Sequence, residues 1–118
     1  MEEQKPNNIS KVVDRLRRER HAKDAAAREA GEQCGRHWAE DVAEEEELRD
    51  VAEFEVQNVR REHLDVLMRR NASLYEFICS CAEDEEWCSL TQGPYEVTFT
   101  AGLVEAARDV WRQVQKHL

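Results

Sequence analysis

The chain has 118 residues, enough for one domain with a modest hydrophobic core. Charged residues make up 36% of it and the formal net charge is −9, which argues against direct contact with nucleic acid or with an anionic membrane. Four Gly and two Pro leave few breaks among strong helix formers, so we expect an all-α fold of four or five helices, with a long N-terminal helical arm or hairpin packed on a C-terminal helix.

The first residues are polar, and no apolar run precedes the first amphipathic segment. We therefore predict a flexible leader over residues 1–8, a single α-helical domain over 9–118, no signal peptide and no membrane span, which together favour the cytoplasm. In that reducing compartment the cysteines are expected to be free thiols, mostly buried. They are Cys34, Cys79, Cys81 and Cys88.

Asn7 or Asn8 is predicted to cap the first helix, because a short polar side chain can accept hydrogen bonds from the first turn. Apolar residues follow at the i, i+3, i+4 and i+7 spacing of one helix face: Ile9, Val12, Val13 and Leu16. An unbroken helix over 9–52 would measure roughly 65 Å, more than a compact domain of this size spans. Either the helix breaks, most readily at Gly31 or Gly35, or the protein is elongated or oligomeric, and the sequence leaves this choice open.

The middle of the chain predicts two further helices. The first covers residues 55–70 and stops at Asn71, and its inward positions are Val56, Val59, Leu64 and Leu67. Ser73 followed by Glu76 matches the capping-box spelling, which places the start of a second, short helix at Ser73.

The C-terminal segment allows two interpretations. Gly93-Pro94 closes the clearest loop of the chain, over residues 89–94. Residues 95–100 alternate apolar and polar side chains as a strand does, but they also begin a helical stripe that continues to Val114. Since a single strand would have no partner, we favour a helix over 94–117 and keep the strand as the alternative.

Small residues recur at four-residue spacing in two rows, which would let helix backbones approach closely. The first row is Ala27, Gly31, Gly35 and Ala39, and the second is Thr98, Gly102 and Ala106. The two rows could face each other inside one core, or they could form a dimer seam or a groove for a partner.

The charge is unevenly distributed. Residues 11–28 carry seven Lys or Arg against three acids, a net +4, whereas residues 40–55 carry nine acids against Arg49, a net −8. The two blocks could neutralise each other across an antiparallel pair or a homodimer. Otherwise the acidic block suits a basic surface on a partner protein.

The leading functional hypothesis is therefore a non-enzymatic acidic protein-interaction module. The analogy of charge is with small regulators or inhibitors of the anti-defence or antitoxin kind, which bind a basic surface on a partner, including one that binds nucleic acid. The expected partner-binding residues are Glu40, Asp41, Glu44, Glu45, Glu46, Glu47, Asp50, Glu83, Asp84, Glu85 and Glu86.

A second hypothesis is an enzyme. Glu44-x-x-Glu47 is followed by Glu62-x-x-Asp65, and this ExxE…ExxD spacing, over residues 44–67, resembles the acidic quartet of the all-α nucleotide pyrophosphatases of the MazG type. The resemblance implies that these four carboxylates hold Mg²⁺, which bridges the phosphates of a nucleoside triphosphate. Clustered carboxylate oxygens are ligands that Mg²⁺ accepts.

A structural zinc site is a further alternative. Cys34 and His37 lie one turn apart, and four ligands could be drawn from them and the cysteines at 79, 81 and 88. No CxxC or HxxxH spelling occurs, and two cysteines at i, i+2 on a helix point apart. We therefore predict no metal site and, outside the Mg²⁺ alternative, no cofactor.

Overall fold

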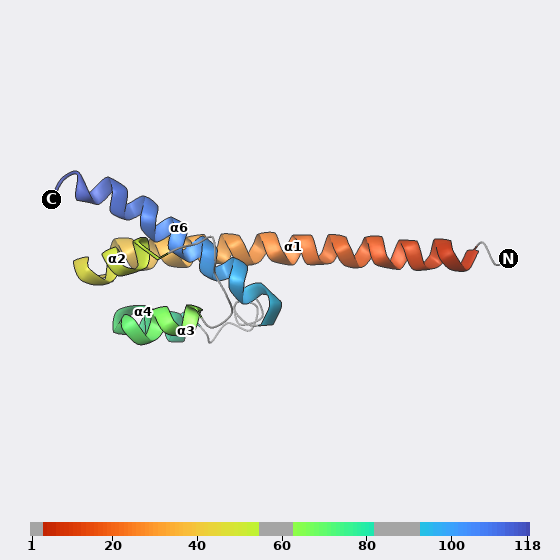
Figure 1. The fold of residues 1–118 in the computed structure, drawn as a ribbon, viewed down its shortest axis with the longest axis horizontal. Coiled ribbons are helices and arrows are strands. Elements are labelled where there is room, and N and C mark those ends of the chain that lie inside the picture. The colour runs from red at the N-terminus through yellow and green to blue at the C-terminus, as the bar shows by residue number, and fades with distance from the viewer. Residues whose placement is uncertain (1–3, 55–62, 82–92) are drawn as a thin grey trace.

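The computed structural model describes residues 4–54, 63–81 and 93–118, and every element in these ranges is helical. The elements are α1 (Gln4–Asp41), α2 (Glu45–Ala52), α3 (His63–Arg70), α4 (Ala72–Cys81), the short 3₁₀ helix η1 (Gly93–Tyr95) and α6 (Glu96–Gln115). The predicted all-α class, with a long N-terminal helix packed on a C-terminal helix, is confirmed (Figure 1). None of the described helices is long and apolar enough to cross a membrane.

Helix α1 runs without a break through both of its glycines for 38 residues, about 57 Å at 1.5 Å per residue. It therefore makes the molecule elongated, with extents of 69 × 29 × 20 Å. It also begins at Gln4, so the predicted cap at Asn7 or Asn8 is wrong, because both residues lie inside the helix. Residues 4–8 of the predicted leader are helical, and residues 1–3 lie outside the described part.

The C-terminal end of α1 is a tight turn into α2 rather than a continuous helix to residue 52. The backbone N–H groups of Val42 and Ala43 both donate to the Trp38 carbonyl, at 3.0 and 2.8 Å. Trp38 is fully buried, and its Nε1–H donates to Ser73 Oγ at 3.0 Å. This anchored tryptophan sets the position of the turn.

The two rows of small residues face each other where α6 crosses α1 (Figure 1). A Cβ added to Gly31 would overlap the Phe99 carbonyl oxygen and lie 2.9 Å from its carbonyl carbon. Conversely, a Cβ added to Gly102 of α6 would overlap the Arg28 carbonyl oxygen of α1. Of the two arrangements that the sequence left open, the structure has close packing inside one core.

The core lies between α1, α6 and the smaller helices. Its fully buried large side chains include Trp38, Leu67, Leu74, Phe99 and Leu103. Helix α6 also holds the end of α2, because the Arg108 guanidinium donates to the carbonyl oxygens of Ala52 and Phe54, at 2.8 and 2.6 Å. The helix favoured over 94–117 is confirmed in α6 and the strand alternative is wrong, since the stripe from Phe99 to Val110 is buried as a helix face.

Asn71 separates α3 from α4, as predicted, and it is 2% exposed. Its Nδ2 group donates to Asp50 Oδ2 at 3.0 Å and to the Leu67 carbonyl at 2.9 Å. The predicted capping box at Ser73 is wrong, because α4 begins at Ala72 and Ser73 lies in its first turn. The predicted helix over 55–70 is described only from residue 63 onward.

Candidate interaction surfaces

Five exposed carboxylates gather where α1 turns into α2, and we call this group the acidic corner: Glu40, Asp41, Glu44, Glu45 and Glu46. Arginines of the same helices contact two of them, Arg36 with Glu40 at 3.9 Å and Arg49 with Glu45 at 3.7 Å. Ion pairs this exposed contribute at most about 1 kcal/mol. The corner therefore presents net negative charge to solvent on a turn that hydrogen bonds hold in place.

Two acids that the sequence assigned to partner binding are used inside the fold instead. Glu47 accepts hydrogen bonds from the Ser73 backbone N–H at 3.1 Å and from its hydroxyl at 2.7 Å. Asp50 pairs with Arg70 and accepts from the buried Asn71 amide. Both carboxylates join α2 to the α3–α4 turn. The sequence analysis had grouped them with the exposed acids because all of these acids are neighbours in the chain.

Part of the acidity of α2 has a local cause. Glu45, Glu46 and Glu47 occupy the first turn of this helix, where carboxylates interact favourably with the free N–H groups and the helix dipole. The second acidic run, residues 83–86, lies outside the described residues, and so does Glu55.

Of the four carboxylates in the proposed Mg²⁺ quartet, the structure describes Glu44, Glu47 and Asp65. Glu47 is engaged with Ser73, Asp65 is exposed on α3, and Glu62 lies outside the described residues. Within residues 4–54, 63–81 and 93–118, no group of three or more His, Cys, Asp or Glu side chains is arranged to hold a metal ion. The enzyme hypothesis therefore stays a prediction from spacing.

Three of the four cysteines are described, and all three are free thiols. Cys34 is buried, Cys81 is half-buried and Cys79 is exposed, so the expectation of mostly buried thiols is wrong for Cys79. Burial, together with the nearby Cys81, raises the pKa of Cys34 to about 12. Cys34, His37 and Cys81 line one cavity of about 180 Å³ between α1 and α4.

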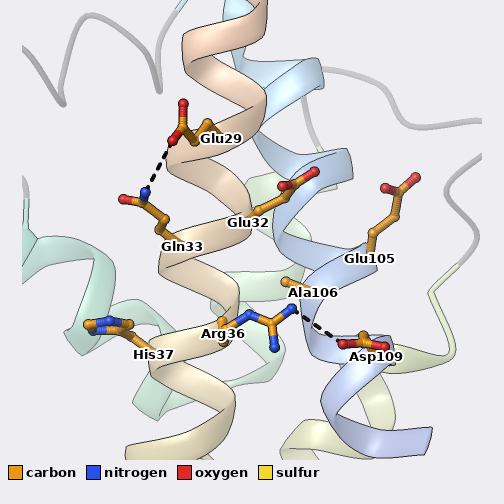
Figure 2. A pocket seen from close by; sticks show the side chains of 8 residues that line it. All are labelled: Glu29, Glu32, Gln33, Arg36, His37, Glu105, Ala106 and Asp109. Carbon is orange, nitrogen blue, oxygen red and sulfur yellow. Dashed lines mark hydrogen bonds and ion pairs between the residues drawn. The ribbon is translucent and has the colours of Figure 1, made fainter.

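A cleft of about 490 Å³ follows the line where α1 meets α6 (Figure 2). Its lining is mostly charged and consists of Glu29, Glu32, Gln33, Arg36, His37, Glu105, Ala106 and Asp109. Figure 2 shows Arg36 reaching across to Asp109, at 3.3 Å, and Glu29 bonded along α1 to Gln33.

The arginines in and beside this cleft pair with its acids. Arg36 pairs with Asp109, and Arg28, next to the cleft, bridges Glu32 and Glu105, whose hydrogen bond and charge raise the pKa of Arg28. These pairs join the two helices beside the glycine contacts. We therefore interpret the cleft as the rim of the α1–α6 interface, which sequence reasoning missed because its partners lie more than 70 residues apart.

A third surface lies at the other end of the molecule. Residues 8–26 of α1 are all exposed, and Figure 1 shows the N-terminal part of the helix extending beyond the other described helices. We call residues 4–26 the arm. Its apolar face was predicted from the sequence, but its exposure was not, because periodicity identifies a face without saying what covers it.

No protein-family model, curated protein or solved structure matches this chain.

Proposed function

We propose that the protein is a non-enzymatic interaction module, a small regulator or inhibitor, that binds a basic surface of a partner protein through the acidic corner. The observation that supports this proposal is the exposure of five carboxylates on one hydrogen-bonded turn, where the described residues supply two weak ion pairs to neutralise them. Basic surfaces of this kind are common on proteins that bind nucleic acid, where a row of carboxylates can occupy the place of phosphates.

The turn is suited to this role because it is preorganised. Its backbone is tied to the buried Trp38, and the first turn of α2 is closed by the Glu44 N–H donating to Glu47 Oε1 at 3.4 Å. A surface that is already ordered loses little conformational entropy on binding. The partner contact is electrostatic, so it forms quickly and weakens as salt is added.

The proposal is tested by neutralising the corner without changing its shape. The corner variant is Glu44→Gln, Glu45→Gln and Glu46→Gln, and the matched control neutralises three exposed acids elsewhere, Asp14→Asn, Glu19→Gln and Glu76→Gln. The wild type and both variants are immobilised, incubated with an extract of the source cells at low and high salt, and the bound proteins are identified by mass spectrometry. Circular dichroism first checks that α2 is still helical in each.

We expect the wild type and the control to retain the same basic proteins at low salt, and the corner variant to lose them. Direct titration with each purified partner should then show an affinity at least tenfold lower for the corner variant. Equal retention by the corner variant and the wild type, with the same salt dependence, would overturn the proposal.

A further inference from the structure

Two of the free thiols line one small cavity between α1 and α4. Cys34 lies on α1 and is 6% exposed, whereas Cys81 is the last residue of α4 and is half-buried. The cavity has a volume of about 180 Å³, and Ala30, Gln33, His37 and Phe77 complete its lining. The fold therefore brings together two reactive groups that are far apart in the sequence.

The spacing of residues along α4 explains why Cys81 is turned toward α1 and Cys79 is not. Leu74 and Ile78 are buried on the inner face of this helix, and Cys81 follows Ile78 by three residues, which places it on the same face. Cys79 follows Ile78 directly, so its side chain is rotated by about 100° from that face, and it is exposed. Helix α4 therefore presents one thiol to α1 and another to solvent.

Cys34 is protected from solvent but lies close to Cys81. Burial is the main reason why the pKa of Cys34 is raised to about 12, and the charge of Cys81 is the second reason. The interaction between two charges weakens with distance, so this second effect requires the two sulfur atoms to be near each other. Cys34 is thus shielded from reagents in solution and adjacent to a thiol that reaches them.

We propose that Cys34 and Cys81 form a reversible disulfide, made by exchange with a small-molecule disulfide such as oxidised glutathione, and that this bond clamps α4 onto α1. The bond joins two helices that already pack together, and Cys81 lies at the end of α4, where a small shift disturbs few helical hydrogen bonds. Its formation follows the ratio of small disulfide to small thiol around the protein. This modification site is separate from the acidic corner and does not depend on the function proposed above.

The reaction consists of two exchanges. In the first, the Cys81 thiolate attacks one sulfur of the small disulfide and bonds to it, the sulfur–sulfur bond of the reagent breaks, and its other half leaves as a thiolate that takes up a proton. In the second, Cys34 loses its proton and its thiolate attacks the Cys81 Sγ atom, and the remaining half of the reagent leaves and is protonated. Two protein thiols are oxidised to one disulfide, and one small disulfide is reduced to two thiols.

The surroundings of the two thiols determine the order of these exchanges. The thiolate is the attacking form, and Cys34 is both buried and reluctant to lose its proton, so the half-buried Cys81 reacts first. The attack by Cys34 is then intramolecular. Holding two reacting groups together raises their effective concentration by many orders of magnitude, which compensates for the small fraction of Cys34 thiolate.

The test compares two proteins that each keep two cysteines. The pair variant carries Cys79→Ser and Cys88→Ser and so keeps Cys34 and Cys81, whereas the control carries Cys81→Ser and Cys88→Ser and keeps Cys34 and Cys79. They share the buried thiol and differ in which face of α4 carries the second one. After circular dichroism has shown that both are folded, each is incubated with oxidised glutathione, quenched with acid at intervals and measured by intact-protein mass spectrometry.

We expect the pair variant to gain one glutathione and then to lose it as the internal disulfide closes. The control should gain one glutathione at Cys79 and close at least tenfold more slowly, because its second thiol points away from Cys34. Adding Cys34→Ser to the pair variant should stop the reaction at the mixed disulfide on Cys81. Closure at equal rates in the pair variant and the control, or no closure in the pair variant, would overturn the proposal.

Thermal unfolding measures the clamp itself. The oxidised pair variant should unfold at least about 5 °C above its reduced form, because the disulfide closes a long loop and restricts the unfolded chain. Dithiothreitol should remove this difference. An unfolding temperature that is unchanged or lowered by oxidation contradicts the clamp.

The wild type provides a second measurement that needs no substitution. After the same treatment with oxidised glutathione, peptide mapping should find the bond between Cys34 and Cys81. Cys88, which lies outside the described residues, competes in this experiment as a further thiol. A dominant disulfide that leaves out Cys34 or Cys81 would reject the proposed pairing.

Discussion

The two halves of α1 share one helix and one apolar face but differ in what surrounds them. In residues 27–41 the face is made of small residues and a tryptophan, and α6 and α4 cover it completely. In the arm the same face is made of larger aliphatic side chains, and the described part of the chain leaves it open. The comparison teaches that the pattern of a helix face and the covering of that face are separate properties.

The difference in side-chain size has a structural consequence. Glycines allow α6 to approach until backbone touches backbone, an arrangement that accepts one partner in one position. The second half of α1 is therefore built for close contact with α6, whereas the isoleucine, valine and leucine side chains of the arm are exposed.

The largest expected difference between the halves comes from removing one apolar side chain from each. Trp38→Ala should lower the free energy of unfolding by about 3–5 kcal/mol, since it empties a fully buried site and leaves Ser73 Oγ without its donor. Ile9→Ala should change it by less than about 0.5 kcal/mol. Urea unfolding at a dilution where the chain is monomeric measures both, and equal losses would erase the distinction.

Adding a methyl group tests the close contact. In an exposed helix Gly→Ala would stabilise by about 1 kcal/mol, but Gly31→Ala should destabilise by at least about 2 kcal/mol, because the new Cβ meets the Phe99 carbonyl. Ala26→Leu, on the exposed arm, is the control and should be nearly neutral. A more stable Gly31→Ala protein in thermal unfolding would mean that the helices do not touch there.

The comparison extends to the acids. Glu47→Ala should cost about 2 kcal/mol, because the Ser73 N–H and hydroxyl lose a charged acceptor. Glu46→Ala, next to it on the exposed corner, should cost less than about 0.5 kcal/mol. Unfolding of the two variants by urea separates acids that hold the fold from acids that face solvent, and similar costs would show that the corner is structural as well.

The effect with the smallest consequence for stability at neutral pH concerns the reactivity of the thiols. With its pKa raised to about 12, Cys34 should react with iodoacetamide at pH 8 at least about a hundredfold more slowly than the exposed Cys79. Mass spectrometry of the labelled protein measures the order of reaction, and urea should abolish the difference. Comparable rates in the folded protein would mean that α4 does not cover this part of α1.

The same burial predicts the sign of a pH effect. An unfolded thiol loses its proton near its ordinary pKa of 9.0, whereas the folded Cys34 keeps it to about 12. The free energy of unfolding should therefore fall as pH rises through this window. The fall should be smaller in Cys34→Ala than in the wild type, and an identical pH dependence of the two would contradict the raised pKa.

Much of the architecture followed from periodicity and composition. Leu64 and Leu67 were placed on an inward helix face by spacing alone, and both are buried. The helix starts were less predictable. Ser73 matches the sequence motif of a capping box, yet its N–H and hydroxyl donate to Glu47, 26 residues away. No local sequence pattern could have identified that partner.

The candidate surfaces divide in the same way. Sequence counting located the acidic block at 40–55, but it could not separate Glu46, which faces solvent, from Glu47 and Asp50, which bond to the α3–α4 turn. The apolar stripe of the arm was likewise visible in the sequence. That it is exposed depends on where α6 begins to touch α1, which is a property of the packed chain.

The sequence by itself determined the helical class, the faces of the helices and the separation of basic from acidic segments, because these depend on propensity and on spacing within one element. Only the tertiary structure decided that α1 passes unbroken through Gly31 and Gly35, that the glycines contact α6, and that the other described helices leave residues 8–26 exposed. Each of these depends on a neighbour distant in the chain. A glycine in the middle of a helix destabilises it by about 1 kcal/mol relative to alanine, and the close packing of α6 on α1 offsets that cost.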